Sequence, residues 1–192
     1  VVSYVCQHKN YYEYTKIIVS SDKDFFLLCK DDTVVIWRPI QKEFINRGIL
    51  VNKHKIHPNN YALARAIDGD KSDNLDGVPR VGMKTIQSAF PFLDEAKAYS
   101  CDDLLVHCKM QTKQKTIHKK LIEYQDRVKS NYGIMQLYEP QISNNGRRYI
   151  DYSIDGFEHG FNKLEIQKML MKDGQGSLNL NDLWAAFKNI KP

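Results

Sequence analysis

The strongest constraint on the fold lies between Gly77 and Thr85, where two glycines enclose four residues, two of them valines. This Gly-x-x-x-x-Gly spacing, followed by a Lys-Thr pair at the start of a helix, is a helix-hairpin-helix signature. Glycine lets the backbone approach a phosphate closely, and the N-terminus of a helix offers unpaired N–H groups and a favourable dipole. We therefore predict nucleic-acid contacts from Gly77, Arg80, Gly82, Lys84 and Thr85.

An acidic run lies directly upstream of this signature. Three aspartates occur between Asp68 and Asp73, with Gly69 between the first two. Hard oxygen ligands at flexible spacing suit Mg²⁺ or Mn²⁺. In isolation, an Asp-rich turn that caps the next helix through Ser72 or Asp73 is the simpler interpretation. Joined to the glycine signature, the run favours metal binding by Asp70 and Asp73.

A second acidic pair, Asp22 and Asp24, directly follows an apolar run at residues 17–19. If that run is a strand, the pair stands at its carboxyl end, where open α/β sheets place their ligands. Like charges this close repel unless a cation lies between them or both point into water. Alone, an Asp-x-Asp loop is usually capping or solvated, so the metal hypothesis for this pair depends on the downstream cluster.

The chain changes character near residue 55. Residues 1–8 predict the end of a helix, residues 17–19 a short buried strand, and residues 33–37 a second strand. From Pro58 onward the apolar spacing is helical almost throughout. We therefore expect an α/β part over residues 1–55 and a mainly α-helical part, with the helix-hairpin-helix motif, over residues 56–192.

Two helix starts are predicted from polar residues. Ser20 or Ser21 is a candidate cap for a short helix carrying Phe25 to Leu28. Asn59 or Asn60 is a candidate cap for the helix that follows it.

Composition adds weaker limits. The net charge of +5, from 28 basic and 23 acidic residues, does not separate a nucleic-acid binder from any basic enzyme. The four cysteines lack zinc-ligand spacing, so we expect reduced thiols and oxygen ligands for any metal. The longest apolar runs are far shorter than the roughly 18 residues that span a bilayer. With no secretion signal in the sequence, we expect a cytoplasmic protein that does not contact membranes.

Basic residues outside the signature are less informative. A lysine-rich stretch, formed by Lys109, Lys113, Lys115, Lys119 and Lys120, would extend a duplex footprint or simply form a solvated helix face. The solvated face is the favoured interpretation, because Ile117, Leu121 and Val128 would bury the other side of the helix. Arg38 and Arg65 could also reach phosphate, but nothing in their positions indicates it.

Three segments together resemble the flap endonuclease and 5′–3′ exonuclease superfamily, which includes the nuclease domain of bacterial DNA polymerase I and the phage enzymes called ribonuclease H. They are residues 19–25, 69–74 and 77–85, in the order and at separations similar to the family's. The resemblance covers about residues 1–95 and favours a phage-type member. It implies a partial PIN-like nuclease sheet before the helical part.

The same resemblance implies a two-metal mechanism, with Mg²⁺ or Mn²⁺ ions about 4 Å apart and water attacking a phosphodiester. Asp22 and Asp24 would bridge the two metal positions, and Asp70 and Asp73 would hold the second. The substrate would be branched or 5′-flap DNA, or an RNA primer on DNA, during replication and repair. The family's hairpin grips the duplex backbone without reading its sequence.

Further implications concern ions and partners. Backbone carbonyls near Val78 and Val81 would bind a monovalent cation such as K⁺. Replication proteins are candidate partners, and a monomer is expected.

This sequence also departs from the family pattern. Three acidic elements of the first metal site, and the basic helical arch, are not found in these residues, and residues 1–5 resemble the helix that normally follows the last of those acids. We therefore expect a downstream portion that binds DNA weakly and cleaves little by itself. Two alternatives remain: a non-catalytic helix-hairpin-helix DNA-binding module, and a ribonuclease of the related PIN type.

Overall fold

The computed structural model describes residues 1–157, 160 and 162–188. The chain forms two compact units, Val1–Gln141 and Ile142–Pro192, each considered by itself. The predicted division near residue 55 falls inside the first unit, so it is not a break in packing. As a division between a nuclease-type part and a helical part, it stays a prediction.

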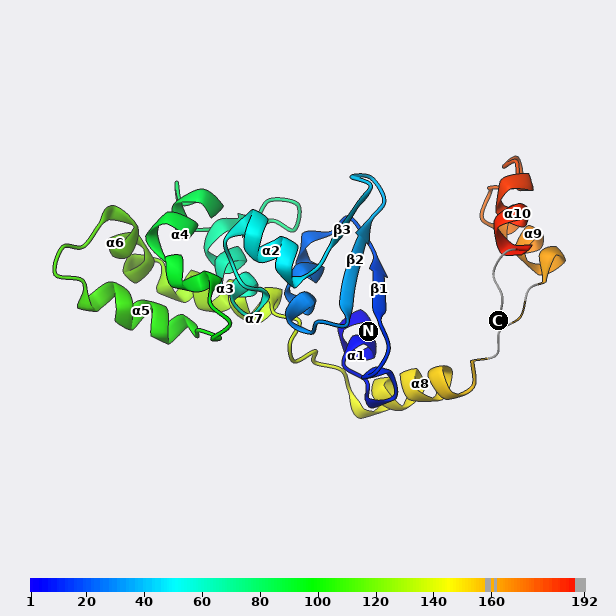
Figure 1. Ribbon diagram of the computed structural model, residues 1–192, viewed down its shortest axis with the longest axis horizontal. Coiled ribbons are helices and arrows are strands. Elements are labelled where there is room, and N and C mark those ends of the chain that lie inside the picture. The colour runs from blue at the N-terminus through cyan, green and yellow to red at the C-terminus, as the bar shows by residue number, and fades with distance from the viewer. Residues whose placement is uncertain (158–159, 161, 189–192) are drawn as a thin grey trace. The chain divides into compact units, whose positions relative to one another are not determined.

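The N-terminal part of the first unit contains a three-stranded sheet (Figure 1). Its strands are β1 (Lys16–Val19), β2 (Val34–Arg38) and β3 (Glu43–Ile45). Strand β2 lies in the middle, parallel to β1 and antiparallel to β3. The α/β start and its first two strands are thus confirmed, while β3 was not foreseen.

Strand β1 is less buried than its sequence suggested. Ile18 points into the core, but Ile17 and Val19 are 59% and 68% exposed. In the part of the chain that the structure describes, β1 pairs only with β2. The prediction of a buried strand was wrong because an apolar run does not reveal whether both faces of a sheet are covered.

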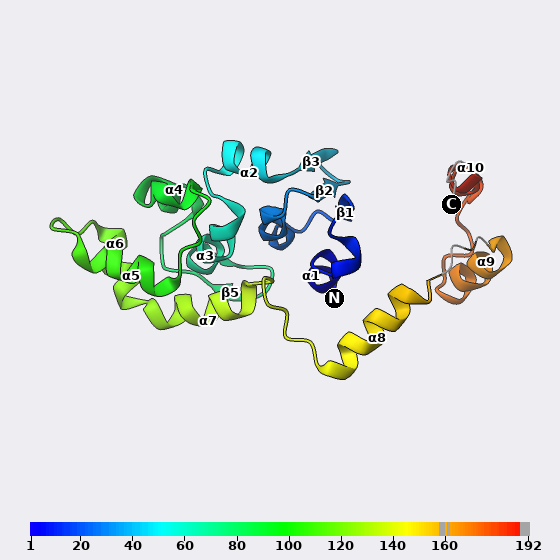
Figure 2. The ribbon, with the colours of Figure 1, turned by 60° about the horizontal axis from the view of Figure 1, so that its bottom comes forward.

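Helices make up most of the rest of the first unit. The α-helices are α1 (Val2–Cys6), α2 (Arg47–His54), α3 (Pro58–Asp68), α4 (Met83–Ala89), α5 (Cys101–Met110), α6 (Thr116–Glu123) and α7 (Gln125–Met135). The 3₁₀-helices are η1 (Lys9–Tyr11), η2 (Lys23–Lys30) and η3 (Pro91–Asp94). A short antiparallel pair, β4 (Gly69–Asp70) and β5 (Leu75–Asp76), interrupts them. Helix α3 packs against η2, α4 and α7, and the two ribbon views show α7 running beside it (Figure 2).

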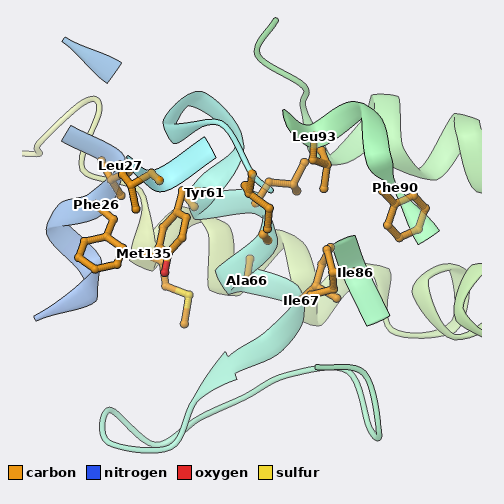
Figure 3. Close-up of a cluster of buried hydrophobic side chains, with 14 of the residues drawn as sticks. Phe26, Leu27, Tyr61, Ala66, Ile67, Ile86, Phe90, Leu93 and Met135 are labelled. Atoms are coloured by element: carbon orange, nitrogen blue, oxygen red, sulfur yellow. The ribbon is translucent and has the colours of Figure 1, made fainter. Parts of the chain in front are cut away.

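Helix α3 is the centre of the hydrophobic core (Figure 3). It is buried on nearly all sides, as expected of a helix with apolar residues around its circumference. Tyr61 lies with its ring centroid 5.4 Å from that of Phe26 in η2. At the other end of α3, Ile67 lies near Ile86 of α4, with Phe90 beyond it. The core thus joins the sheet side of the unit to the helical side.

Both predicted helix caps were wrong. Helix α3 is capped by His57, whose Nδ1 accepts the N–H of Asn59 at 3.2 Å, with Pro58 in the first helical position. The side chain of Asn60 is instead buried and donates to three backbone carbonyls of residues 93–97. Segment η2 is capped by Asp22, whose carboxylate accepts the N–H of Asp24 at 2.9 Å.

The second unit contains α8 (Asn144–Asp155), α9 (Lys163–Lys172) and α10 (Asn181–Lys188). Its clearest packing is at Trp184, which is buried and has the ammonium of Lys163 5.3 Å from its ring. Among all described residues, no helix combines the length and hydropathy needed to cross a membrane.

Candidate metal centre and hairpin loop

Asp70 and Asp73 lie on a tight turn that follows α3. We call residues 70–75, which link β4 to β5, the acidic turn. Gly69 opens it at φ +82°, and a Cβ there would lie 2.3 Å from the backbone nitrogen of Gly77. Asn74 also adopts a left-handed conformation, with φ 56°. The turn is therefore held by backbone geometry that few residues other than glycine and asparagine accept.

The start of η2 brings a third carboxylate to the acidic turn. Asp24, Asp70 and Asp73 can each offer a carboxylate oxygen such that the three oxygens lie within 4.8 Å of one another. Asp22 lines a hollow of about 380 Å³ together with Asp70 and Asp73, but does not belong to this group of three. Its carboxylate is used in capping η2. The structure thus brings three of the four predicted acids together and places the fourth at their edge.

A basic side chain, Arg65 of α3, lies among these acids. Its guanidinium contacts Asp70 directly, lies 3.3 Å from Asp24, and donates to the carbonyl of Gly69 at 3.1 Å. Only 12% of the side chain is exposed. Because like charges in one hollow repel, this cation stabilises the gathered carboxylates.

The position of Arg65 was not predicted from the sequence. The spacing held a signal, because Arg65 and Asp68 are one helical turn apart and their side chains approach to 3.8 Å. The contact with Asp24 spans 41 residues and has no local signature. Arg38, the other arginine considered for phosphate, is buried and pairs with Glu43 at 2.7 Å.

The carboxyl groups of the site differ in the direction in which their pKa values are shifted. Burial raises the pKa of Asp24 even though Arg65 opposes the shift, and burial likewise raises the pKa of Asp68. Hydrogen bonds from the hydroxyl and N–H of Ser72 lower the pKa of Asp70, with Arg65 adding to the effect. On acidification, Asp24 therefore takes up a proton before Asp70 does.

The donor set fits a hard divalent cation. Clustered carboxylate oxygens that are partly open to water are what Mg²⁺ and Mn²⁺ prefer. Ser72 donates to Asp70 through its N–H at 2.8 Å and its hydroxyl at 2.5 Å, which fixes the orientation of that carboxylate.

The glycine signature forms a loop between β5 and α4. We call residues 77–82 the hairpin loop. Val78 and Val81 are buried, and the N–H of Val78 donates to the carbonyl of Ile67 at 2.8 Å. Arg80 is exposed and left-handed, with φ 60°, while Lys84 and Thr85 are exposed at the start of α4. The loop is therefore anchored by its valines and presents polar groups to solvent.

Gly77 has a packing role in this loop. A Cβ at Gly77 would lie 2.2 Å from the backbone oxygen of Asp68. At Gly82, the nearest atom to such a Cβ is a side-chain oxygen of Asp68 at 3.7 Å. Close approach to α3 thus requires glycine at residue 77 but not at residue 82. The DNA contacts assigned to both glycines stay predictions.

Helices α6 and α7 brace the hairpin loop from one side. The buried side chain of Asn131 donates to the carbonyls of Ala66 and Asp76 at 3.0 and 2.9 Å. Arg127 donates to the carbonyl of Gly77 at 3.2 Å, and Lys120 to that of Pro79 at 2.5 Å. Of these three donors, only Lys120 stood out in the sequence, as part of a basic stretch.

The fold is similar to that of solved 5′-exonucleases. T5 5′-exonuclease with bound zinc superposes with a TM-score of 0.59 at 17% identity, over 71% of this chain and 48% of the other. A mutant of the same enzyme gives a TM-score of 0.58 at 16% identity, over 72% and 55% of the two chains. No protein-family model matches the sequence.

Sequence relatives agree with the fold. DNA polymerase I of Mycobacterium tuberculosis strain H37Rv is 35% identical over 75 residues, which are 38% of this chain. A 5′-3′ exonuclease of Buchnera aphidicola is 35% identical over 69 residues, which are 36% of this chain. The chain is related to the 5′-nuclease superfamily.

The present chain matches only a small part of the length of these relatives. The matched segments span 8% of the mycobacterial polymerase and 24% of the Buchnera exonuclease. The mixed α/β fold with its small sheets matches that of T5 5′-exonuclease.

Proposed function

We propose that this chain is the metal-binding and duplex-gripping part of a divalent-metal-dependent 5′-nuclease. It would hydrolyse phosphodiesters at 5′ ends or flaps of DNA, or at RNA primers on DNA, in replication and repair. The observation that carries the proposal is the convergence of Asp24, Asp70 and Asp73 beside the hairpin loop. The fold shared with a 5′-exonuclease that binds divalent metal supports it.

In this proposal Asp24, Asp70 and Asp73 hold Mg²⁺ or Mn²⁺, and Asp22 joins them at the edge of the hollow. When bound, the two divalent ions stabilise the attacking and leaving oxygens of an in-line displacement at phosphorus. Asp22 fixes the turn that points Asp24 at the acidic turn, by accepting the N–H of Asp24. Arg65 keeps the carboxylates close before the metal arrives.

The hairpin loop and the first turn of α4 would form a helix-hairpin-helix grip on the duplex. Arg80, Lys84 and Thr85 are exposed there, as a contact with phosphates requires. Such contacts set register and orientation and carry no sequence information. The grip would thus place a 5′ end by shape rather than by base recognition.

We further propose that the rest of the carboxylate ring lies outside these 192 residues. An apolar hollow of about 660 Å³ lies along β1 and is lined by residues that include Val2, Val5, Ile17 and Val19. A further strand beside β1 would cover it, as the sheets of α/β folds usually are covered. The 192-residue chain by itself would then bind DNA weakly and cleave little.

The proposal is tested by Mn²⁺ titration calorimetry on the purified chain and on a variant carrying Asp24→Asn and Asp70→Asn. We expect the wild type to bind Mn²⁺ and the double variant to lose at least about tenfold in affinity, because two anionic ligands become neutral. Asp94→Asn, on η3 and outside the hollow, is the matched control.

DNA binding separates the nuclease from a non-catalytic hairpin module. Fluorescence anisotropy with a 5′-flap duplex measures affinity with and without Mn²⁺. A nuclease part binds the flap more tightly when Mn²⁺ is present, and the double variant loses that gain. Wild-type chain with no measurable Mn²⁺ affinity would contradict the proposal.

A further inference from the structure

The carbonyls of the hairpin loop already have cationic donors from the same chain. Arg127 Nη1 lies 3.2 Å from the oxygen of Gly77, and Lys120 Nζ lies 2.5 Å from that of Pro79. These two carbonyls flank Val78 on either side. Two positive charges are thus directed at the loop from α6 and α7.

This arrangement fits poorly with the expected K⁺ at Val78 and Val81. The carbonyl of Val78, one of the two expected ligands, already accepts the N–H of Val81 at 3.1 Å. A K⁺ ion needs several converging oxygens and would lie beside two fixed positive charges. Its binding there is disfavoured by repulsion and by competition for the carbonyls.

Packing fixes the helices that carry the two cationic side chains. The guanidinium of Arg127 lies 5.1 Å from the ring centroid of Tyr124. Buried residues of the same helices, among them Leu121 and Val128, anchor α6 and α7 in the core. Asn131, one turn beyond Arg127, fixes α7 to the backbone on both sides of the acidic turn. The two positive charges are therefore carried by packed helices of the fold itself.

We propose that Lys120 and Arg127 serve as built-in cations of the hairpin loop in place of a monovalent metal ion. The inference concerns the loop to which the proposed function assigns duplex binding. It rests on that function only where DNA binding is measured. The loop keeps its conformation without K⁺. Its contact with DNA phosphates depends on total ionic strength but not on which monovalent cation supplies it.

Hydrogen exchange tests the loop without DNA. Amide exchange of peptides covering residues 77–86 is measured by mass spectrometry on the full chain in KCl and in tetramethylammonium chloride of equal ionic strength. We expect the same protection in both salts for the wild type. A variant with Lys120→Met and Arg127→Met exchanges faster in tetramethylammonium and regains protection in KCl. The charge-conserving variant with Lys120→Arg and Arg127→Lys behaves as the wild type.

Flap-duplex binding by anisotropy, without divalent metal, provides the second readout. We expect equal wild-type affinity in the two salts and roughly tenfold weaker binding by the methionine variant, since two positive charges beside the loop are lost. Lys9→Met, on the exposed surface of η1, is the control for charge alone. Stronger loop protection of the wild type in KCl overturns the inference, as does unchanged exchange in the methionine variant. Wild-type chain that binds no DNA in either salt overturns the proposed grip, while the exchange result still decides the inference.

Discussion

Replacing Arg65 by Gln should destabilise the metal-free protein and improve its affinity for Mn²⁺. The guanidinium contacts Asp70 directly and lies 3.3 Å from Asp24. Removing one partner of a fully buried ion pair costs about 3–5 kcal/mol. Because the side chains of Asp24 and Asp70 remain 23% and 15% exposed, water screens part of this cost. We expect a loss of roughly 2 kcal/mol at pH 7.5, or about 6 °C in Tm for a unit of this size.

Mn²⁺ should reverse the loss. Without the guanidinium, the carboxylates have no internal cation to compete with the metal, so we expect the Arg65→Gln variant to bind Mn²⁺ about tenfold more tightly. At a Mn²⁺ concentration of about 100 Kd, binding alone stabilises a protein by about 2.7 kcal/mol. The variant should therefore approach the Tm of the metal-free wild type or exceed it.

The assay combines calorimetric titration with thermal unfolding, each with and without Mn²⁺. Arg65→Lys keeps the charge and should fall between wild type and Arg65→Gln. Arg47→Gln is the matched control, because Arg47 forms a more exposed pair with Asp32 at 3.0 Å and one hydrogen bond to the carbonyl of Lys30, and should lose only about 1 kcal/mol. The reasoning is refuted if Arg65→Gln costs no more than Arg47→Gln, or if its Mn²⁺ affinity equals that of the wild type.

Three further predictions concern stability. Asn131→Ala leaves two backbone carbonyls without their donor and should cost about 2–3 kcal/mol in urea unfolding, more than the same change at an exposed asparagine. Gly77→Ala places a Cβ 2.2 Å from the backbone oxygen of Asp68 and should cost about 3 kcal/mol, with faster proteolysis near the hairpin loop; wild-type resistance would contradict the packing argument. Burial lowers the pKa of His57 and of His118, so below pH 6.5 the unfolded chain binds more protons than the folded one. The urea concentration at the unfolding midpoint should therefore be lower at pH 5 than at pH 7. Gln at both positions should reduce that pH dependence.

The order of the acidic and glycine motifs along the chain could be predicted from the sequence because each motif is local. The acidic turn and the hairpin loop each occupy a few consecutive residues, and their spacing alone indicated metal and phosphate chemistry. The change from strand to helix patterning also depends only on neighbours in sequence, and β1, β2 and α3 form where the sequence predicts them.

Contacts between segments far apart in the chain could not be predicted from the sequence. A period of apolar residues predicts which face of a helix is buried, but it does not say which carboxylate a helix brings near another. The sequence therefore determined that acids and a glycine loop follow one another along this chain. The tertiary structure alone decided that Arg65 reaches Asp24 and that Lys120 and Arg127 meet the hairpin loop, because these contacts depend on how α3, α6 and α7 pack.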